Sequence, residues 1–333
     1  METFLIVSII VISFILISIY IPTIFISKHI YIKELTKEYN KDKWGRCCSA
    51  PWDKEQVLMY DKGLEFEKEN KEYKENLEIT NDNLKLYGEY FNFGKNKSVI
   101  IVCGRTESLL YSYYYAKPYK ELGYNILVID NRCHGLSEGN FIGVGFTEQY
   151  DVLAWAKLIH EKYNQNHIIL HSICVGCASA IYALTNKDCP KYILGMVADG
   201  MYKTFYATFI THMKDIKKPP YPLANYVMLR LKKITKVNPK KYGPINAVKI
   251  LDKPLLMIHS KEDIYSLPKC AKEIYDNSNK ELTKLVWFDK GRHSHVRINN
   301  ELKYDNTIKE FVGEYFKSWN MHLWQWILNH YMT

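Results

Sequence analysis

The stretch HSICVGCASA, residues 171–180, reads as the end of a strand, a sharp turn and the start of a helix. Small side chains at Ser172, Gly176 and Cys177 leave room for a chain that reverses from a strand into a helix within a few residues. In such a turn the central residue is strained and its side chain points out above the sheet. The stretch therefore predicts an elbow that presents Cys174, although a strand-to-helix junction that merely prefers small residues would look the same.

Apolar runs on both sides of this turn alternate with amphipathic stretches. The predicted strands cover residues 75–80, 85–93, 98–103, 125–130, 167–172, 192–199, 254–260 and 283–289. The predicted helices cover residues 108–122, 147–163, 174–186, 267–278 and 306–318. The first two strands alternate like an antiparallel hairpin, whereas the later ones are nearly continuous apolar runs, as strands buried on both faces are. This order predicts an α/β domain over residues 75–318 with a doubly wound, mostly parallel eight-stranded sheet.

The interval between the sixth and seventh strands, residues 203–250, is too long for a simple crossover and predicts a helical lid over the C-terminal edge of the sheet. It holds eleven Lys or Arg and one acid, whereas the whole chain has a formal net charge of +9. One predicted helix places apolar and basic residues on different faces: Leu223, Val227, Leu231 and Ile234 against Arg230, Lys233 and Lys236. Such a helix rests on an anionic leaflet, accepts an anionic substrate, or is an ordinary lid with a solvated face. No recognised nucleic-acid-binding motif accompanies the basic patch, so nucleic acid is not an expected partner.

The N-terminal residues 3–27 contain no charged side chain and are long enough to span a bilayer. A cleaved signal peptide has a basic start and a shorter apolar stretch, so residues 1–27 are predicted as a single-pass transmembrane anchor. A signal peptide and a buried helix are the alternatives. Basic residues follow the span and none precedes it, which predicts a cytosolic domain: Lys28, Lys33, Lys37, Lys41, Lys43 and Arg46. Residues 28–74 are predicted as a polar helical connector, and residues 319–333 form a Trp-rich tail.

Two further stretches place candidate catalytic residues just after predicted strands. HSKED, residues 259–263, puts Asp263 after the seventh strand, and DKGRHSH, residues 289–295, puts His293 or His295 after the eighth. A nucleophile, an acid and a histidine in this chain order can form a catalytic triad. The acid would orient the imidazole, and the imidazole would take the nucleophile's proton and pass it to the leaving group.

Acyl transfer also needs two backbone N–H groups directed at the developing oxyanion. Val175, directly after the predicted nucleophile, would supply one. The stretch Cys103-Gly104-Arg105-Thr106 follows the third strand, and Arg105, after a tight turn at Gly104, would supply the other. Both contributions come from the backbone, so no particular side chain is required.

Over residues 75–318 the sequence resembles the α/β-hydrolase superfamily, and in particular membrane-anchored members with a serine-aminopeptidase-like or acyl-esterase-like domain. The matching stretches are VIIVCGRTES (99–108), VIDNRCHGLSEG (128–139), VADGMY (197–202), PINAVKILDKPLLMIHSKED (244–263) and GRHSH (291–295). The resemblance implies Cys174 as nucleophile, Asp263 as acid and His293 as base, with His295 as the fallback base.

Four positions depart from the family pattern: Cys174 for the nucleophilic serine, Ser172 for a glycine, Cys103 for a histidine and Cys133 for a glycine. Branches such as dienelactone hydrolases and acyl-CoA:amino-acid N-acyltransferases use cysteine, so the resemblance remains compatible with catalysis. A thiolate forms a thioester intermediate, which suits esters, thioesters or transfer to an amine. The expected function is hydrolysis or transfer of an acyl group. The expected substrate is a small acyl compound or a lipid-like molecule, and an anionic substrate is one alternative. The alternative is a catalytically silent protein that binds a ligand or a membrane partner.

No metal or organic cofactor is expected. Cys103, Cys174 and Cys177 would gather near one edge of the sheet, which permits a redox or metal site, but no histidine stands at ligand spacing beside them.

Overall fold

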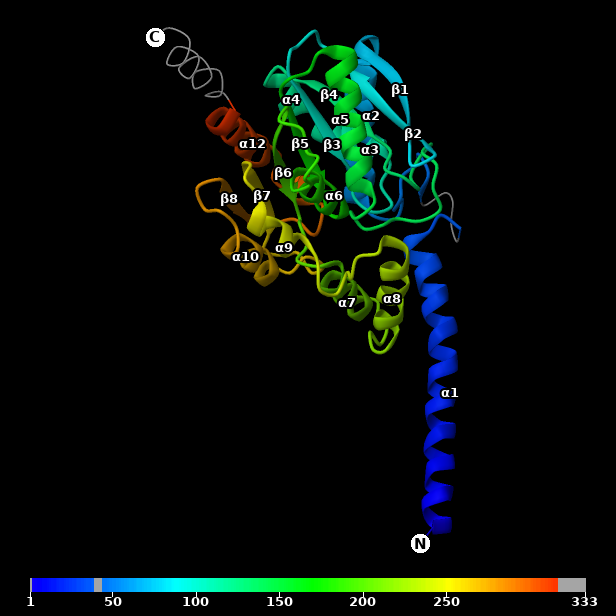
Figure 1. Cartoon of the computed structure of the whole chain (residues 1–333). Coiled ribbons are helices and arrows are strands. Elements are labelled where there is room, and N and C mark those ends of the chain that lie inside the picture. Colours follow the sequence, from blue (N-terminus) through cyan, green and yellow to red (C-terminus); the bar gives the residue numbers. More distant parts are fainter. Residues whose placement is uncertain (1, 39–43, 317–333) are drawn as a thin grey trace.

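The computed structural model describes residues 2–38 and 44–316 of the chain. Its centre is an eight-stranded sheet in the order β1-β2-β4-β3-β5-β6-β7-β8 (Figure 1). The strands are β1 (Lys74–Asn81), β2 (Leu84–Phe91), β3 (Ser98–Val102), β4 (Asn125–Ile129), β5 (Ile168–Ile173), β6 (Ile193–Asp199), β7 (Leu255–Ser260) and β8 (Thr283–Phe288). β2 pairs antiparallel with β1 and β4, and all other pairs are parallel. The predicted sheet is therefore confirmed.

Side chains of the central strands alternate between two apolar layers. In β3, Ile100 and Val102 face one core and Val99 and Ile101 face the other. Every residue of β3 is buried, which explains why this strand is a continuous apolar run. The first layer is covered by α5 (Glu148–Tyr163), α6 (Val175–Leu184) and α10 (Pro268–Asp276), and the second by α2 (Lys54–Glu69), α3 (Leu109–Ser112), α4 (Lys117–Glu121) and α12 (Glu301–Phe316).

Two predicted helices differ from the observed ones. The predicted helix 108–122 is divided into α3, the 3₁₀ turn η3 (Tyr113–Tyr115) and α4. Pro118 accounts for the division, because proline has no N–H for a continuing helix and is tolerated in a first turn, where the structure places it. α12 begins at Glu301, five residues before its predicted start. The Trp-rich tail, residues 319–333, lies outside the described residues.

Residues 44–69, predicted as a polar connector, instead belong to the globular body. Asp53 caps α2 by accepting hydrogen bonds from the amides of Glu55 and Gln56. Met59 and Phe66 of the same helix are buried in the second core. The polar composition of this segment reflects the outer face of α2, while a narrow apolar stripe holds it to the sheet.

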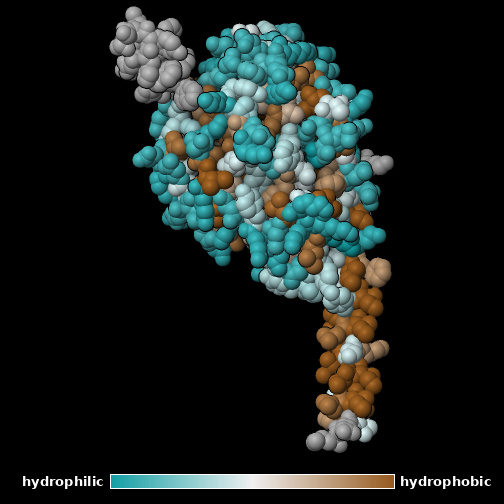
Figure 2. Space-filling view, in the orientation of Figure 1, coloured by the Kyte–Doolittle hydropathy of each residue, from teal (hydrophilic) through white to brown (hydrophobic). Residues whose placement is uncertain are grey.

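α1 (Glu2–Leu35) is one continuous helix that projects from the body (Figure 1). The most apolar 18-residue window of Thr3–Leu35 has a mean hydropathy of 3.0, and the helix is long and apolar enough to cross a membrane, a property that signal sequences and buried core helices share. None of its most apolar window is buried, and Figure 2 shows hydrophobic residues along its projecting length. The helix continues past the predicted end of the span at residue 27, and Leu35 is buried against the body.

The predicted helical lid, residues 203–250, contains α7 (Phe205–Asp215), α8 (Leu223–Thr235), α9 (Pro244–Ala247) and the 3₁₀ turn η4 (Val248–Ile250). α8 packs along α1. Leu223, Val227 and Leu231 are buried in the first core, whereas Ile234 is partly exposed. The apolar face of α8 is therefore covered within the protein and is not free to lie on a bilayer.

Candidate active site

The predicted elbow is present between β5 and α6. Cys174 is the N-cap residue of α6 and has φ 52° and ψ −114°, a strained conformation for a residue with a side chain. Its amide donates a hydrogen bond of 2.9 Å to the carbonyl oxygen of Asp199. Ser172 lies in β5, where its hydroxyl donates to the Val197 carbonyl over 3.0 Å. The turn thus leaves the half-buried Cys174 thiol at the C-terminal edge of the sheet.

Gly176 is required by a close approach of α6 to β3. A Cβ atom at this position would lie 2.3 Å from the carbonyl oxygen of Val102 and 2.7 Å from that of Cys103. Both atoms belong to the backbone, so the contact cannot be relieved by a rotamer change.

Gly176→Ala is therefore expected to lower the free energy of unfolding by about 1–3 kcal/mol, the usual cost of overpacking. The shift in melting temperature of the purified protein measures it. Ser179→Ala, on the same helix, is the matched control and should change the melting temperature little. An unchanged melting temperature in Gly176→Ala would show that α6 can move away from β3.

Asp263 and His293 come together from the loops after β7 and β8. The Nδ1 atom of His293 lies 2.7 Å from Oδ2 of Asp263. The second carboxylate oxygen, Oδ1, accepts hydrogen bonds from the amides of Tyr265 and Ser266 at 2.8 and 2.7 Å. The acid is therefore fixed from both sides, and it fixes the orientation of the imidazole.

Electrostatics favour an ionised pair at this position. Burial alone would raise the pKa of Asp263, but the His293 imidazolium lowers it below its usual range. Burial alone would lower the pKa of His293, but the Asp263 carboxylate and the nearby Cys174 sulfur hold it well above its usual value. With Nδ1 directed at Asp263, Nε2 is the ring nitrogen left for Cys174.

His295, the fallback base, does not reach Asp263. Its Nδ1–H donates to the carbonyl oxygen of His293 over 2.7 Å, and its Nε2 lies 3.9 Å from Oδ2 of Asp53. The order of residues in the sequence could not show which of the two histidines contacts Asp263. In the structure, the loop after β8 places His293 in that contact.

The two residues predicted to supply the oxyanion amides line the cavity that Cys174 also lines. Val175 is the first residue of α6, Arg105 follows Gly104, and all three line the same cavity as Cys174. Among residues 2–38 and 44–316, no hydrogen-bond acceptor is paired with either amide. The Arg105 guanidinium turns away and binds Glu34 of α1 at 2.8 Å.

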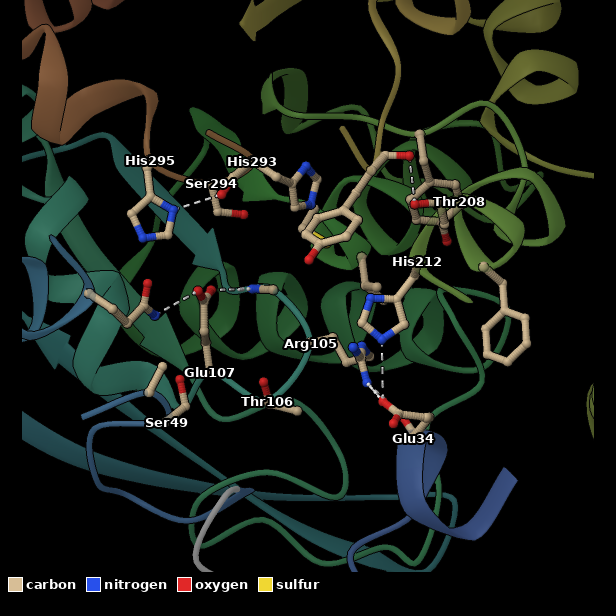
Figure 3. A pocket seen from close by; sticks show the side chains of 18 of the residues that line it. Glu34, Ser49, Arg105, Thr106, Glu107, Thr208, His212, His293, Ser294 and His295 are labelled. Atoms are coloured by element: carbon tan, nitrogen blue, oxygen red, sulfur yellow. Dashed lines mark hydrogen bonds and ion pairs between the residues drawn. The ribbon is translucent and has the colours of Figure 1, made fainter. Parts of the chain in front are cut away.

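The cavity at this site has a volume of about 350 Å³ and is built from distant parts of the chain. The end of α1, the segment before α2, the loop after β3 and the lid helix α7 all contribute to its wall. Phe205, Thr208, Phe209 and His212 are the α7 contributions. Figure 3 shows Arg105 and His212 both directed at Glu34, with His293 on the other side of the cavity.

Two buried carboxyl groups near the site were not predicted. Glu107 accepts hydrogen bonds from the Gly104 amide at 3.1 Å and from Gln56 Nε2 at 3.2 Å (Figure 3). Burial raises the pKa of Glu107 and raises that of Asp199 to about 7. The sequence held one indication of Glu107, because this acidic residue lies within the motif at the end of a predicted apolar strand. Its partner Gln56 could not be found in this way, because Gln56 belongs to the segment that was predicted to be a connector.

One group among the described residues brings acidic and imidazole ligands close enough for a metal ion: Asp53, Glu55 and His295. The Arg292 guanidinium already lies 2.9 Å from Asp53 and 3.0 Å from Glu55. A cation at that place would meet this positive charge, so the group is best described as an ion-pair cluster.

The strand order, the elbow after β5 and the acid and histidine loops after β7 and β8 define the α/β-hydrolase fold. No family model matches the chain. The uncharacterized protein YqkD of Bacillus subtilis (strain 168) is 27% identical over 220 residues, which are 65% of this chain and 71% of YqkD.

Solved structures of hydrolases are also similar to this chain. The Pyrococcus furiosus esterase Pf2001 has a TM-score of 0.61 and 26% identity, covering 75% of this chain and 95% of the esterase. The Pyrococcus horikoshii acylaminoacyl peptidase has a TM-score of 0.58 and 20% identity, covering 74% of this chain and 42% of the peptidase. The similarity to the peptidase shows the fold, and the similarity to the esterase supports hydrolase as the general class of activity.

Proposed function

We propose that this protein is a membrane-anchored cysteine hydrolase that cleaves, or transfers to an amine, an ester- or thioester-linked acyl group. The observation that carries the proposal is the arrangement of Cys174, His293 and Asp263: the imidazole is hydrogen-bonded to Asp263 and interacts electrostatically with the Cys174 sulfur, which lines the same cavity. The similarity to an esterase supports the ester part of the proposal.

In the proposed reaction, the Cys174 thiolate attacks the acyl carbonyl carbon while the His293 imidazolium holds the proton. The amides of Val175 and Arg105 stabilise the oxyanion of the tetrahedral intermediate. His293 then protonates the leaving group as the intermediate collapses to a thioester on Cys174. Water or an amine, deprotonated by His293, attacks this thioester and regenerates the thiolate.

The cavity supports a substrate with an apolar acyl part. Phe205 and Phe209 of the lid line it beside Cys174. The Arg105 charge is largely neutralised by Glu34, so the apolar wall is the stronger recognition element. A small acyl or lipid-like substrate fits this lining better than a strongly anionic one.

α1 is the proposed single-pass anchor. Basic residues follow its apolar stretch and none precedes it, so the globular body is proposed to face the cytosol.

A thiol-directed probe tests the proposal. Cys174 is expected to be alkylated by iodoacetamide faster than Cys270, which is similarly half-buried, and His293→Ala should remove the difference. Hydrolysis of p-nitrophenyl esters and acyl thioesters, measured in parallel, should also depend on His293. Equal alkylation of both cysteines together with no turnover would instead favour the catalytically silent protein, which would use the same cavity to bind a ligand.

A further inference from the structure

The contacts of α8 with α1 fix the height of the lid along the proposed anchor. The rings of Tyr20 and Tyr226 meet edge to face with centroids 5.5 Å apart. At the other end of α8, Ile234 lines the same surface cavity as Lys37, just after α1. The two helices therefore run in the same direction, and α8 begins on the side of the apolar stretch.

The length of α1 places Tyr20 near a membrane boundary. At about 1.5 Å per residue, a hydrocarbon core of roughly 30 Å takes up about 20 residues, so the part of the apolar stretch that begins at residue 3 and fills this core ends about two residues after Tyr20. These residues are almost all exposed, whereas burial against the body begins at Thr23. Tyrosine is enriched at membrane interfaces, which agrees with this position for Tyr20.

The loop between α7 and α8, residues 216–222, is the part of the lid that precedes the Tyr226 contact. It exposes two large apolar side chains, Ile216 at 44% and Tyr221 at 58%. Between them stand Lys217 and Lys218, both exposed and without an ion-pair partner among the described residues. Figure 1 shows the lid as the part of the body that extends farthest along α1 toward its N-terminus.

We propose that this loop docks on the surface of a bilayer that contains anionic lipids, with Ile216 and Tyr221 entering the interface and Lys217 and Lys218 pairing with headgroup charges. The proposal rests on α1 being the membrane anchor of the proposed function. It combines apolar insertion with charge complementarity, the two terms that hold interfacial segments on membranes.

The basic residues of α8 itself do not fit this role. Lys232, Lys233 and Lys236 lie at the end of α8 that is near Lys37, about 9 to 15 Å beyond Tyr226 along the helix. This exceeds the screening length of about 8 Å at physiological ionic strength. Of the alternatives for α8, the leaflet contact is therefore assigned to the loop that precedes it.

Photo-crosslinking of the full chain in nanodiscs tests the proposal. Replacing Tyr221 by p-benzoylphenylalanine should give lipid adducts in phosphatidylglycerol nanodiscs and fewer in phosphatidylcholine nanodiscs. The same replacement at Tyr73, which is also exposed but precedes β1 at the opposite edge of the sheet, is the control and should give none. Resistance of the protein to alkaline extraction, measured first, reports separately whether α1 is an anchor.

Charge reversal supplies the second arm. Lys217→Glu combined with Lys218→Glu should reduce adducts at position 221 by about 25-fold or more in phosphatidylglycerol, since each of the two lysines near a charged surface contributes a factor of about five. Lys187→Glu with Lys191→Glu, before β6, should leave the yield unchanged. Lipid adducts no more frequent at position 221 than at position 73, in a protein that resists extraction, would overturn the docking proposal. Equal yields in both lipids would overturn its anionic component.

Discussion

Cys174→Ala is expected to abolish acyl turnover, with kcat lower by about 10⁴-fold or more, as when a covalent nucleophile is removed from a working triad. No other thiol can replace it in this cavity. Cys103 and Cys177 are fully buried, and burial raises the pKa of both thiols. Steady-state hydrolysis of a p-nitrophenyl ester and of an acyl thioester measures the loss.

Cys270→Ala is the matched control, because Cys270 is a half-buried thiol on α10 outside the cavity, and it should retain full turnover. Cys174→Ser is expected to keep the melting temperature but lose most activity, because a hydroxyl is not ionised beside an imidazolium. Turnover that survives in Cys174→Ala would rule out the covalent mechanism.

Asp263→Asn is expected to lower kcat by about 10³- to 10⁴-fold, because the imidazole loses both its orienting acceptor and the charge that stabilises its protonated form. The pKa of His293 should fall, since the Asp263 carboxylate is the leading interaction that raises it. In the proposed mechanism, a less basic imidazole takes the proton of Cys174 less readily. The alkylation rate of Cys174 at neutral pH should therefore fall as well.

The Asp263–His293 pair should also affect how the stability of the protein depends on pH. The folded-state pKa of Asp263 is lowered, so its contribution to the free energy of unfolding is present above its usual pKa and is lost as the pH falls through the folded value. Asp263→Asn should remove this contribution and flatten the acid limb of a stability curve. Asp289→Asn, an exposed acid after β8 that pairs only with Lys261 among the described residues, is the control. Normal turnover in Asp263→Asn would exclude Asp263 from the site.

Local chemistry determined most of the secondary structure. The apolar runs that become β3 to β7 are buried on both faces, and each observed strand lies within two residues of its predicted bounds. The elbow could also be predicted from the sequence, because only small residues, such as Gly176, allow α6 to lie so close to β3. Chain order then brought Asp263 and a following histidine to the same edge of the sheet, since the carboxyl ends of parallel strands share one edge.

The remaining features depend on contacts between segments that are far apart in the sequence. The conformation of the loop after β8 determines that His293, and not His295, contacts Asp263. The sequence of two neighbouring histidines does not predict that conformation. Residues 44–69 look like a polar connector because their apolar residues are few, yet Gln56 reaches Glu107 beside the elbow.

HSICVGCASA by itself predicted a sharp turn between a strand and a helix with a cysteine at its centre, because the small residues that permit such a turn are a local property of the sequence. Only the tertiary structure decided which imidazole contacts Asp263 and which face of α8 is covered. Both depend on which surfaces of the folded chain come into contact. The sequence pattern of a helix shows which face is apolar, but it does not show which distant segment covers that face.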